Sequence, residues 1–221
     1  MNSSKMLEKN ISQYPALELF QKLGYKYISP EDCIVQRKGT YGCILQDILK
    51  EQLKKLNSYE YNGKVCKFSN FNIEKAVSDL DVPIQEGLIV ASEKVYNLLT
   101  MGRSYVEQVD DRKVSFDLNY IDWHNFENNV FHVTQEFAVD SHTGEHNARV
   151  DIVLFVNGIP FAAIECKSGV ESVDQAVEQN IRNQTDFYIP QLFKYVSLVV
   201  ACNKNEVKYG TTRTKKKFYS V

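Results

Sequence analysis

The sequence predicts an α/β protein whose first part, about residues 1–103, is largely helical and whose later part, about residues 104–210, carries a β-sheet. Apolar residues recur at helical spacing through the first hundred positions, β-branched and aromatic residues dominate afterwards, and one amphipathic stretch separates the last two strand candidates. The chain has 221 residues, 43% of them hydrophobic, and contains no repeat or Pro/Gly-rich linker. We therefore expect one domain over residues 1–221.

The first predicted helix lies between Pro15 and Gly24, where Leu17, Phe20 and Leu23 recur at helical spacing. A second segment has a strongly amphipathic pattern of isoleucines and leucines. The helices that follow the first are expected near residues 44–56, 71–81 and 84–99.

Five stretches read as strands because they are rich in β-branched and aromatic residues. The predicted helix between the last two strands, about residues 170–184, places Val170, Val173, Val177 and Ile181 on one face. The order along the chain therefore indicates antiparallel strands, a helix, and a final strand. The five stretches are KVSFDLNYI (113–121), VFHVTQEFAV (130–139), RVDIVLFV (149–156), IPFAAIECK (159–167) and YVSLVVACN (195–203).

Composition excludes several classes of protein. The 26 basic and 28 acidic residues nearly cancel, so a surface for nucleic acid has to be local. The sequence has no phosphate-binding loop, no dinucleotide fingerprint, no signal-peptide apolar region and no stretch long enough to cross a membrane. Five scattered cysteines without a CxxC pair indicate free thiols in a reducing compartment. We expect a cytoplasmic protein.

Asp151, Glu165 and Lys167 interrupt two neighbouring strands that are otherwise apolar, and Asn157-Gly158 between the strands is a strong hairpin signal. A two-residue turn, with no compensating bulge elsewhere, would put Asp151 and Glu165 on opposite faces of the sheet. A three-residue loop, 156–158, with a bulge at its glycine would put Asp151 diagonal to Glu165 on the same face, roughly 7 Å away. The pattern favours the second arrangement if these residues form a site.

Two carboxylates followed by a lysine form a hard-oxygen site that suits Mg²⁺ or Mn²⁺. A divalent cation held by Asp151 and Glu165 could activate water and offset phosphate charge, while Lys167 orients the water or neutralises the phosphate. The Cys166 side chain should point into the core, and its backbone carbonyl could be a further ligand. The alternative is a solvated strand end with a cross-strand charge pair, but burying carboxylates without a cation is costly.

At these residues the sequence resembles the PD-(D/E)xK nuclease superfamily, in particular the N-terminal nuclease domain of the restriction subunit of type I restriction-modification enzymes. The phrase VDIVLFVNGIPFAAIECKSG carries the resemblance, together with PALELFQKLGYKYISPED, LNYIDWHNFENNVFHVTQEF and IPQLFKYVSLVVACNKNEVKYGT. It implies a restriction-endonuclease-like core, namely a mixed central sheet flanked by helices. It also implies Mg²⁺-dependent cleavage of unmodified double-stranded DNA.

The resemblance further implies that the chain is a fragment of a longer polypeptide with C-terminal translocase domains, so that ATP enters only through domains absent from this chain. Methyltransferase and specificity subunits are the implied partners. A repair or junction-resolving nuclease of the same superfamily, or a DNA-binding or subunit-docking module that does not cut, remain alternatives.

Related nucleases carry a Gln-x-x-x-Tyr element on the helix after the ExK strand, which can be placed here as Gln184 with Tyr188. Gln179 is the other candidate glutamine, with Asn183 where the tyrosine would fall. Glu18 and Glu8 are the candidates for an upstream acidic ligand. The dense basic run is either a phosphate-contacting patch or a linker; it comprises Arg213, Lys215, Lys216 and Lys217 and follows Lys204 and Lys208.

Overall fold

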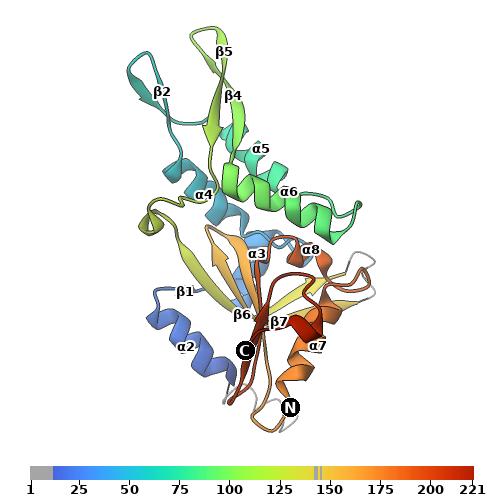
Figure 1. The fold of residues 1–221 in the computed structure, drawn as a ribbon. Coiled ribbons are helices and arrows are strands. Elements are labelled where there is room, and N and C mark those ends of the chain that lie inside the picture. Colours follow the sequence, from blue (N-terminus) through green and yellow to red (C-terminus); the bar gives the residue numbers. More distant parts are fainter. Residues whose placement is uncertain (1–11, 142–143, 145) are drawn as a thin grey trace.

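A six-stranded mixed sheet forms the centre of the computed structural model, which describes residues 12–141, 144 and 146–221 (Figure 1). The strands β6, β7 and β8 are antiparallel to one another, β1 joins β6 in parallel, and β9 joins β8 in parallel after a helical crossover. This confirms the predicted order of antiparallel strands, helix and strand. The sheet runs β1 (Lys26–Tyr27), β6 (Phe131–Asp140), β7 (Asn147–Val156), β8 (Ile159–Cys166), β9 (Leu198–Cys202) and β10 (Val207–Gly210).

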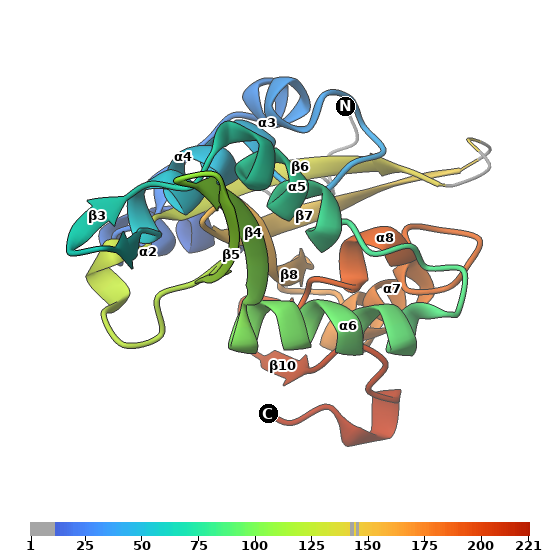
Figure 2. The same cartoon turned by 90° about the horizontal axis from the view of Figure 1, so that it is seen from above.

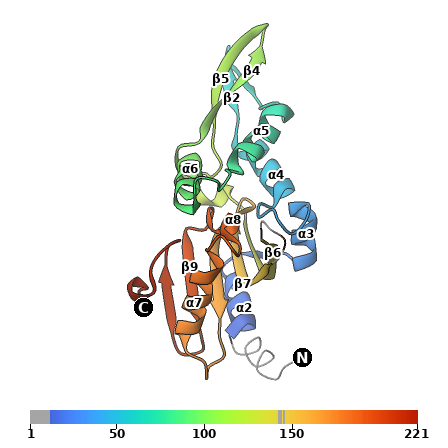
Figure 3. The same ribbon diagram turned by 90° about the vertical axis from the view of Figure 1, so that its right-hand side faces the viewer.

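Helices cover both faces of this sheet. On one face α2 (Tyr14–Lys22) places Leu17 in a buried cluster with Ile152 and Ile164. On the other face the crossover helix α7 (Val173–Asn183) buries Val177 in the main core with Ala163. Figure 3 shows α2 and α7 on opposite sides of the strands. The expected mixed sheet flanked by helices is therefore confirmed.

The rest of the first half of the chain forms a helical part beside the sheet. It consists of α3 (Pro30–Arg37), α4 (Gln46–Leu56), α5 (Asn70–Leu80) and α6 (Leu88–Met101), and α6 packs against the short α8 (Pro190–Phe193) (Figure 2). The sequence prediction located α4, α5 and α6 but missed α3. No helix in the described part of the chain is long and apolar enough to span a membrane.

Two hairpins project from the helical part, away from the sheet (Figures 1 and 3). They are β2 (Tyr59–Tyr61) with β3 (Lys64–Cys66), and β4 (Arg103–Val109) with β5 (Arg112–Leu118). The stretch 113–121 was expected to belong to the sheet, but it supplies β5 of this separate hairpin. The rings of Tyr59 and Phe116 stack 4.0 Å apart and hold the two hairpins together.

The start of α7 also differs from the prediction. Ser172 caps the helix by accepting a hydrogen bond from the Asp174 backbone N–H, so the helix begins at Val173 rather than near residue 170. Val170 consequently lies outside the helix and is 90% exposed, whereas Val173 and Val177 are buried as expected. Helical periodicity alone could not place the boundary, because the cap decides it.

Candidate active site

The hairpin between β7 and β8 carries the predicted carboxylates, and its turn is tighter than expected. Val156 pairs with Ile159, so the loop is the two residues Asn157 and Gly158, whose φ angles are 54° and 84°. These angles define a type I′ turn. The prediction of a three-residue loop was wrong. A Cβ on Gly158 would lie 2.6 Å from the Leu45 carbonyl oxygen, so both the φ angle and the close approach of α4 require glycine.

The side chain of Asn157 explains why the turn has this length. It is completely buried and makes four hydrogen bonds. Its Oδ1 accepts from the Val130 N–H at 2.9 Å and from Gln52 Nε2 at 3.2 Å, and its Nδ2 donates to the Tyr120 carbonyl at 3.0 Å and to Asn129 Oδ1 at 2.8 Å. An asparagine tolerates the left-handed conformation, and these partners hold it there.

A β-bulge brings the two carboxylates back to the same face. Phe155 pairs with Pro160, but its neighbour Leu154 pairs with Ala162, which leaves Phe161 as the extra residue. The shifted register continues to Ile152 opposite Ile164, and one further step places residue 151 opposite residue 165. The short turn would have separated the carboxylates, and the bulge compensates for it.

Asp151 and Glu165 therefore lie side by side at the end of the hairpin. Asp151 Oδ2 accepts a 2.7 Å hydrogen bond from the Cys166 backbone N–H. Burial raises the pKa of Asp151, although that hydrogen bond and the charge of Lys167 act in the opposite direction. Burial and then repulsion from Asp151 raise the pKa of Glu165, which is fully buried. The pair carries a desolvation cost that a cation would reduce.

Two amides on α7 hold Glu165. Gln179 Nε2 donates to Glu165 Oε2 at 2.7 Å, while Gln179 Oε1 accepts from Lys167 Nζ at 2.9 Å. Gln179 thus bridges the glutamate and the lysine of the ExK motif. Asn183 Nδ2 donates to Glu165 Oε1 at 3.2 Å. The sequence signal for Asn183 was its spacing of four residues from Gln179, which puts both amides on one side of the helix.

The structure does not bring the other predicted helix residues to the carboxylates. Gln184 is buried, donates to the Asn180 carbonyl at 3.1 Å and accepts from the Arg213 backbone N–H at 2.6 Å. The Tyr188 ring lies against the guanidinium of Arg182, with 4.9 Å from Cζ to the ring centroid, and stacks on His146 at 5.7 Å.

The upstream acidic candidates also lie apart or cannot be placed. Glu18 is exposed on α2, and Glu8 lies outside the described residues. The chain before α2 instead contributes two residues that the sequence reasoning missed. Gln13 Nε2 donates to the Asp151 carbonyl at 2.9 Å and to Glu136 Oε1 at 3.2 Å, and Ser12 Oγ donates to the Lys167 carbonyl at 2.8 Å. No sequence pattern pointed to these contacts.

The Cys166 thiol lies where the alternation of the strand predicted, in the core cluster below the sheet and 3.6 Å from Cys202 Sγ. Within the described residues, no group of three or more histidine, cysteine, aspartate or glutamate side chains is arranged to hold a metal ion. Asp151 and Glu165 offer two carboxylates to a metal ion, and the backbone carbonyl of Cys166 is a predicted addition.

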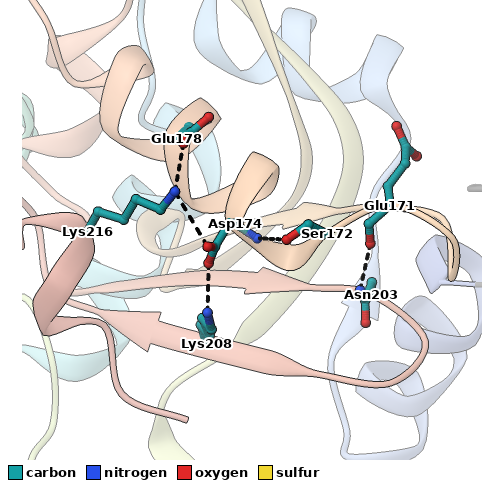
Figure 4. Close-up of polar contacts among 7 residues, drawn as sticks. All are labelled: Glu171, Ser172, Asp174, Glu178, Asn203, Lys208 and Lys216. Atoms are coloured by element: carbon teal, nitrogen blue, oxygen red, sulfur yellow. Dashed lines mark hydrogen bonds and ion pairs between the residues drawn. The ribbon is translucent and has the colours of Figure 1, made fainter.

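Part of the C-terminal basic run is neutralised by α7 (Figure 4). Lys216 Nζ lies 2.7 Å from Glu178 Oε1 and 3.5 Å from Asp174 Oδ2, and Lys208 Nζ lies 2.7 Å from Asp174 Oδ1. The Lys208 hydrogen bond accordingly lowers the pKa of Asp174. These two lysines fasten the C-terminal segment to the crossover helix.

Comparison with known proteins identifies a protein family that this chain matches. The model of a family described as the type I restriction enzyme R protein N terminus matches residues 5–218. Over 217 residues the chain is 25% identical to the putative type I restriction enzyme MjaIXP endonuclease subunit of Methanocaldococcus jannaschii, covering 95% of this chain and 20% of that protein. Over 186 residues it is 29% identical to the MjaVIIIP endonuclease subunit of the same organism, covering 83% and 16%.

A third relative is the type I restriction enzyme EcoprrI endonuclease subunit of Escherichia coli, 26% identical over 173 residues, with coverage of 76% of this chain and 50% of that protein. The chain spans a fifth or less of the length of the two archaeal relatives.

Proposed function

Because the chain belongs to the family of type I restriction enzyme R protein N termini, we propose that it is the Mg²⁺-dependent endonuclease domain of such an R subunit. Its substrate is unmodified double-stranded DNA, and its reaction is hydrolysis of the phosphodiester bond. The observation that carries the proposal is the pairing of Asp151 with Glu165 across adjacent strands, with Lys167 joined to Glu165 through Gln179. We assign the fold to the PD-(D/E)xK type on the same grounds.

The chemistry of the donor set fits a hard divalent cation. Asp151 is partly buried and Glu165 is fully buried, both carboxylates have raised pKa values, and the carbonyl of Cys166 is the neutral oxygen that we propose as a further ligand. Magnesium typically takes one or two carboxylates and completes its shell with water and substrate phosphate. When bound, Mg²⁺ (or Mn²⁺) offsets negative charge on the phosphate and favours formation of the nucleophile from water.

The side chains of the chain itself do the positioning. Lys167 carries a positive charge beside the carboxylates, and its ammonium group can donate to an attacking water or to a non-bridging phosphate oxygen. Gln179 fixes the separation of Lys167 from Glu165 by accepting from one and donating to the other. Asn183 holds the second oxygen of Glu165. Together these contacts keep the charged groups oriented before substrate binds.

The relatives that the chain matches are much longer, which supports a domain acting within a larger assembly. We propose that translocase domains of the same polypeptide supply ATP-driven movement, and that methyltransferase and specificity subunits select unmodified DNA. The domain then cuts in the cytoplasm without having to read bases. ATP is used by the other domains.

The test is cleavage of an unmodified supercoiled plasmid by the complete R subunit, assembled with its methyltransferase and specificity subunits and supplied with Mg²⁺ and ATP. The wild-type complex should linearise the plasmid, and Lys167→Ala should not, while both keep the same ATPase rate. Lys55→Ala, which removes one exposed charge on α4, is the matched control. If the Lys167→Ala complex cleaved the plasmid at the wild-type rate, the mechanism would be refuted. If the wild-type complex did not cleave it, the result would favour a docking module.

A further inference from the structure

Arg182 is a cation beside the carboxylate pair that the proposed reaction has not yet used. It lies on α7 one position before Asn183, and its side chain is exposed. Within the described part of the chain no carboxylate oxygen lies within 4.0 Å of its guanidinium, because Glu178, four residues earlier, pairs with Lys216 instead. An exposed arginine this close to a buried acidic site has its charge available for a ligand.

The guanidinium is nevertheless held in place from two directions. Its Nη2 donates to Asn183 Oδ1 at 3.4 Å, and its Cζ lies 4.9 Å from the centroid of the Tyr188 ring. Tyr188 is itself stacked on His146, which ties it to the loop between β6 and β7. A planar cation on an aromatic face loses little freedom when it binds, since its orientation is set beforehand.

Asn183 connects this cation to the carboxylates. Its Nδ2 donates to Glu165 Oε1 while its Oδ1 accepts from Arg182, so one amide spans the distance between the acidic group and the basic group. The charge of Arg182 also lowers the pKa of Glu165, in opposition to burial. The two charged groups are thus coupled through one buried side chain.

We propose that Arg182 contacts a DNA phosphate next to the one that is cleaved, with its guanidinium plane set by Tyr188 and its position relative to Glu165 set by Asn183. The proposal rests on the proposed function, because the phosphate belongs to the same duplex. Arginine suits this task since its fork of N–H donors matches two phosphate oxygens, which an ammonium group cannot do. Tyr188 then acts through Arg182 as a positioning residue.

The alternative for Arg182 is a solvated side chain that covers Tyr188 and has no ligand. Salt dependence separates the two, because each phosphate contact that is lost lowers the slope of log affinity against log salt by about 0.9. The 221-residue chain and a blunt 30-bp duplex of arbitrary sequence, without divalent cations, provide the binding assay. Fluorescence anisotropy over a range of salt concentrations measures the slope.

Arg182→Ala should weaken duplex binding by about tenfold at moderate salt and reduce the slope by about 0.9. Arg182→Lys should recover the slope but only part of the affinity. Lys55→Ala also removes one positive charge, but on α4, and it should match wild type in duplex affinity and in the salt slope. Because Arg182 is exposed, the melting temperature of each variant should stay close to that of wild type. A slope for Arg182→Ala equal to that of Lys55→Ala would overturn the proposal.

Tyr188 provides a second, independent measurement. Tyr188→Ala should weaken binding in the wild-type background but not in the Arg182→Ala background, whereas Tyr188→Phe keeps the ring and should have little effect. Additive effects of Tyr188→Ala and Arg182→Ala would contradict the positioning role.

Plasmid cleavage by the complete complex separates this inference from the proposed function. If wild type cleaves and Arg182→Ala cleaves equally fast, the inference fails and the nuclease assignment stands. If wild type does not cleave, the nuclease assignment fails, while the binding slope still decides whether Arg182 contacts phosphate.

Discussion

Replacing Asn157 by alanine should severely destabilise the protein, although the residue lies in a turn. The change removes two acceptor bonds, from the Val130 N–H and Gln52, and two donor bonds, to Tyr120 and Asn129. At about 1 kcal/mol for each, these contribute about 4 kcal/mol, and a positive φ at alanine adds about 1 kcal/mol. The sum of about 5 kcal/mol reaches the lower end of the total stability of a typical domain, about 5–15 kcal/mol.

The chain offers a matched control in the projecting hairpin. Asn62 and Gly63 form another two-residue turn with positive φ angles, 50° and 73°, between the paired residues Tyr61 and Lys64. Asn62 is exposed, so Asn62→Ala removes the same side chain from the same backbone conformation without leaving buried partners. It should cost about 1 kcal/mol.

Urea unfolding followed by circular dichroism measures both free energies of unfolding. If Asn157→Ala costs no more than Asn62→Ala, then the buried hydrogen bonds do not stabilise the turn and the explanation of its length is wrong. If Asn157→Ala leaves too little folded protein to measure, Asn157→Ser, which retains a hydroxyl group, gives an intermediate value within range.

Three further predictions concern the same hairpin and its carboxylates. Gly158→Ala should destabilise far more than Gly63→Ala, because both have positive φ but only at Gly158 would an added Cβ lie 2.6 Å from a backbone oxygen, that of Leu45; thermal unfolding of the pair checks this, and equal losses would contradict it. Deletion of Phe161 should remove the bulge but keep Ala162 opposite Leu154 and Ile164 opposite Ile152, so Glu165 should still face Asp151 and cleavage should persist; loss of cleavage by a variant that circular dichroism shows to be folded would contradict this register. Without metal, the raised pKa of Glu165 means that its burial penalty is absent below its ordinary pKa, grows as pH rises from the ordinary towards the raised pKa, and is constant above that. The melting temperature of wild type minus that of Glu165→Gln should therefore fall between about pH 4 and neutrality, and a pH-independent difference would refute the pKa direction.

The strands and helices that bury one face were predictable from sequence, because burial imposes the periodicity that was used to find them. The helices α4, α5 and α6 and the order of β6, β7, β8, α7 and β9 follow from such patterns. The stretch 113–121 misled the prediction because alternation describes a half-buried strand in any sheet, and it does not say which strands are its partners. The pairing of Tyr59 with Phe116 is a contact between distant parts of the chain that no local pattern encodes.

The same limit applies to the site. Asp151, Glu165 and Lys167 stood out because charged residues interrupt apolar strands, and the structure joins Glu165 to Lys167 through Gln179 and places Asp151 beside them, bonded to the Cys166 N–H. Gln13 gave no such signal. It reaches the Asp151 carbonyl only because the chain before α2 passes over the ends of the strands, which no local pattern encodes.

The turn at residues 157 and 158 and the bulge at Phe161 together constrain how the hairpin can change in evolution. With this number of residues between the two carboxylates, a two-residue turn without the bulge would place Glu165 on the face opposite to Asp151, and the unpaired residue at the bulge brings it back. An insertion that the turn absorbs, or loss of the bulged residue itself, leaves the partners of the later residues unchanged, so a relative can differ by one residue here and still keep the aspartate opposite the glutamate. The number of residues between the aspartate and the glutamate therefore has to be read together with the number that the turn and the bulge contribute.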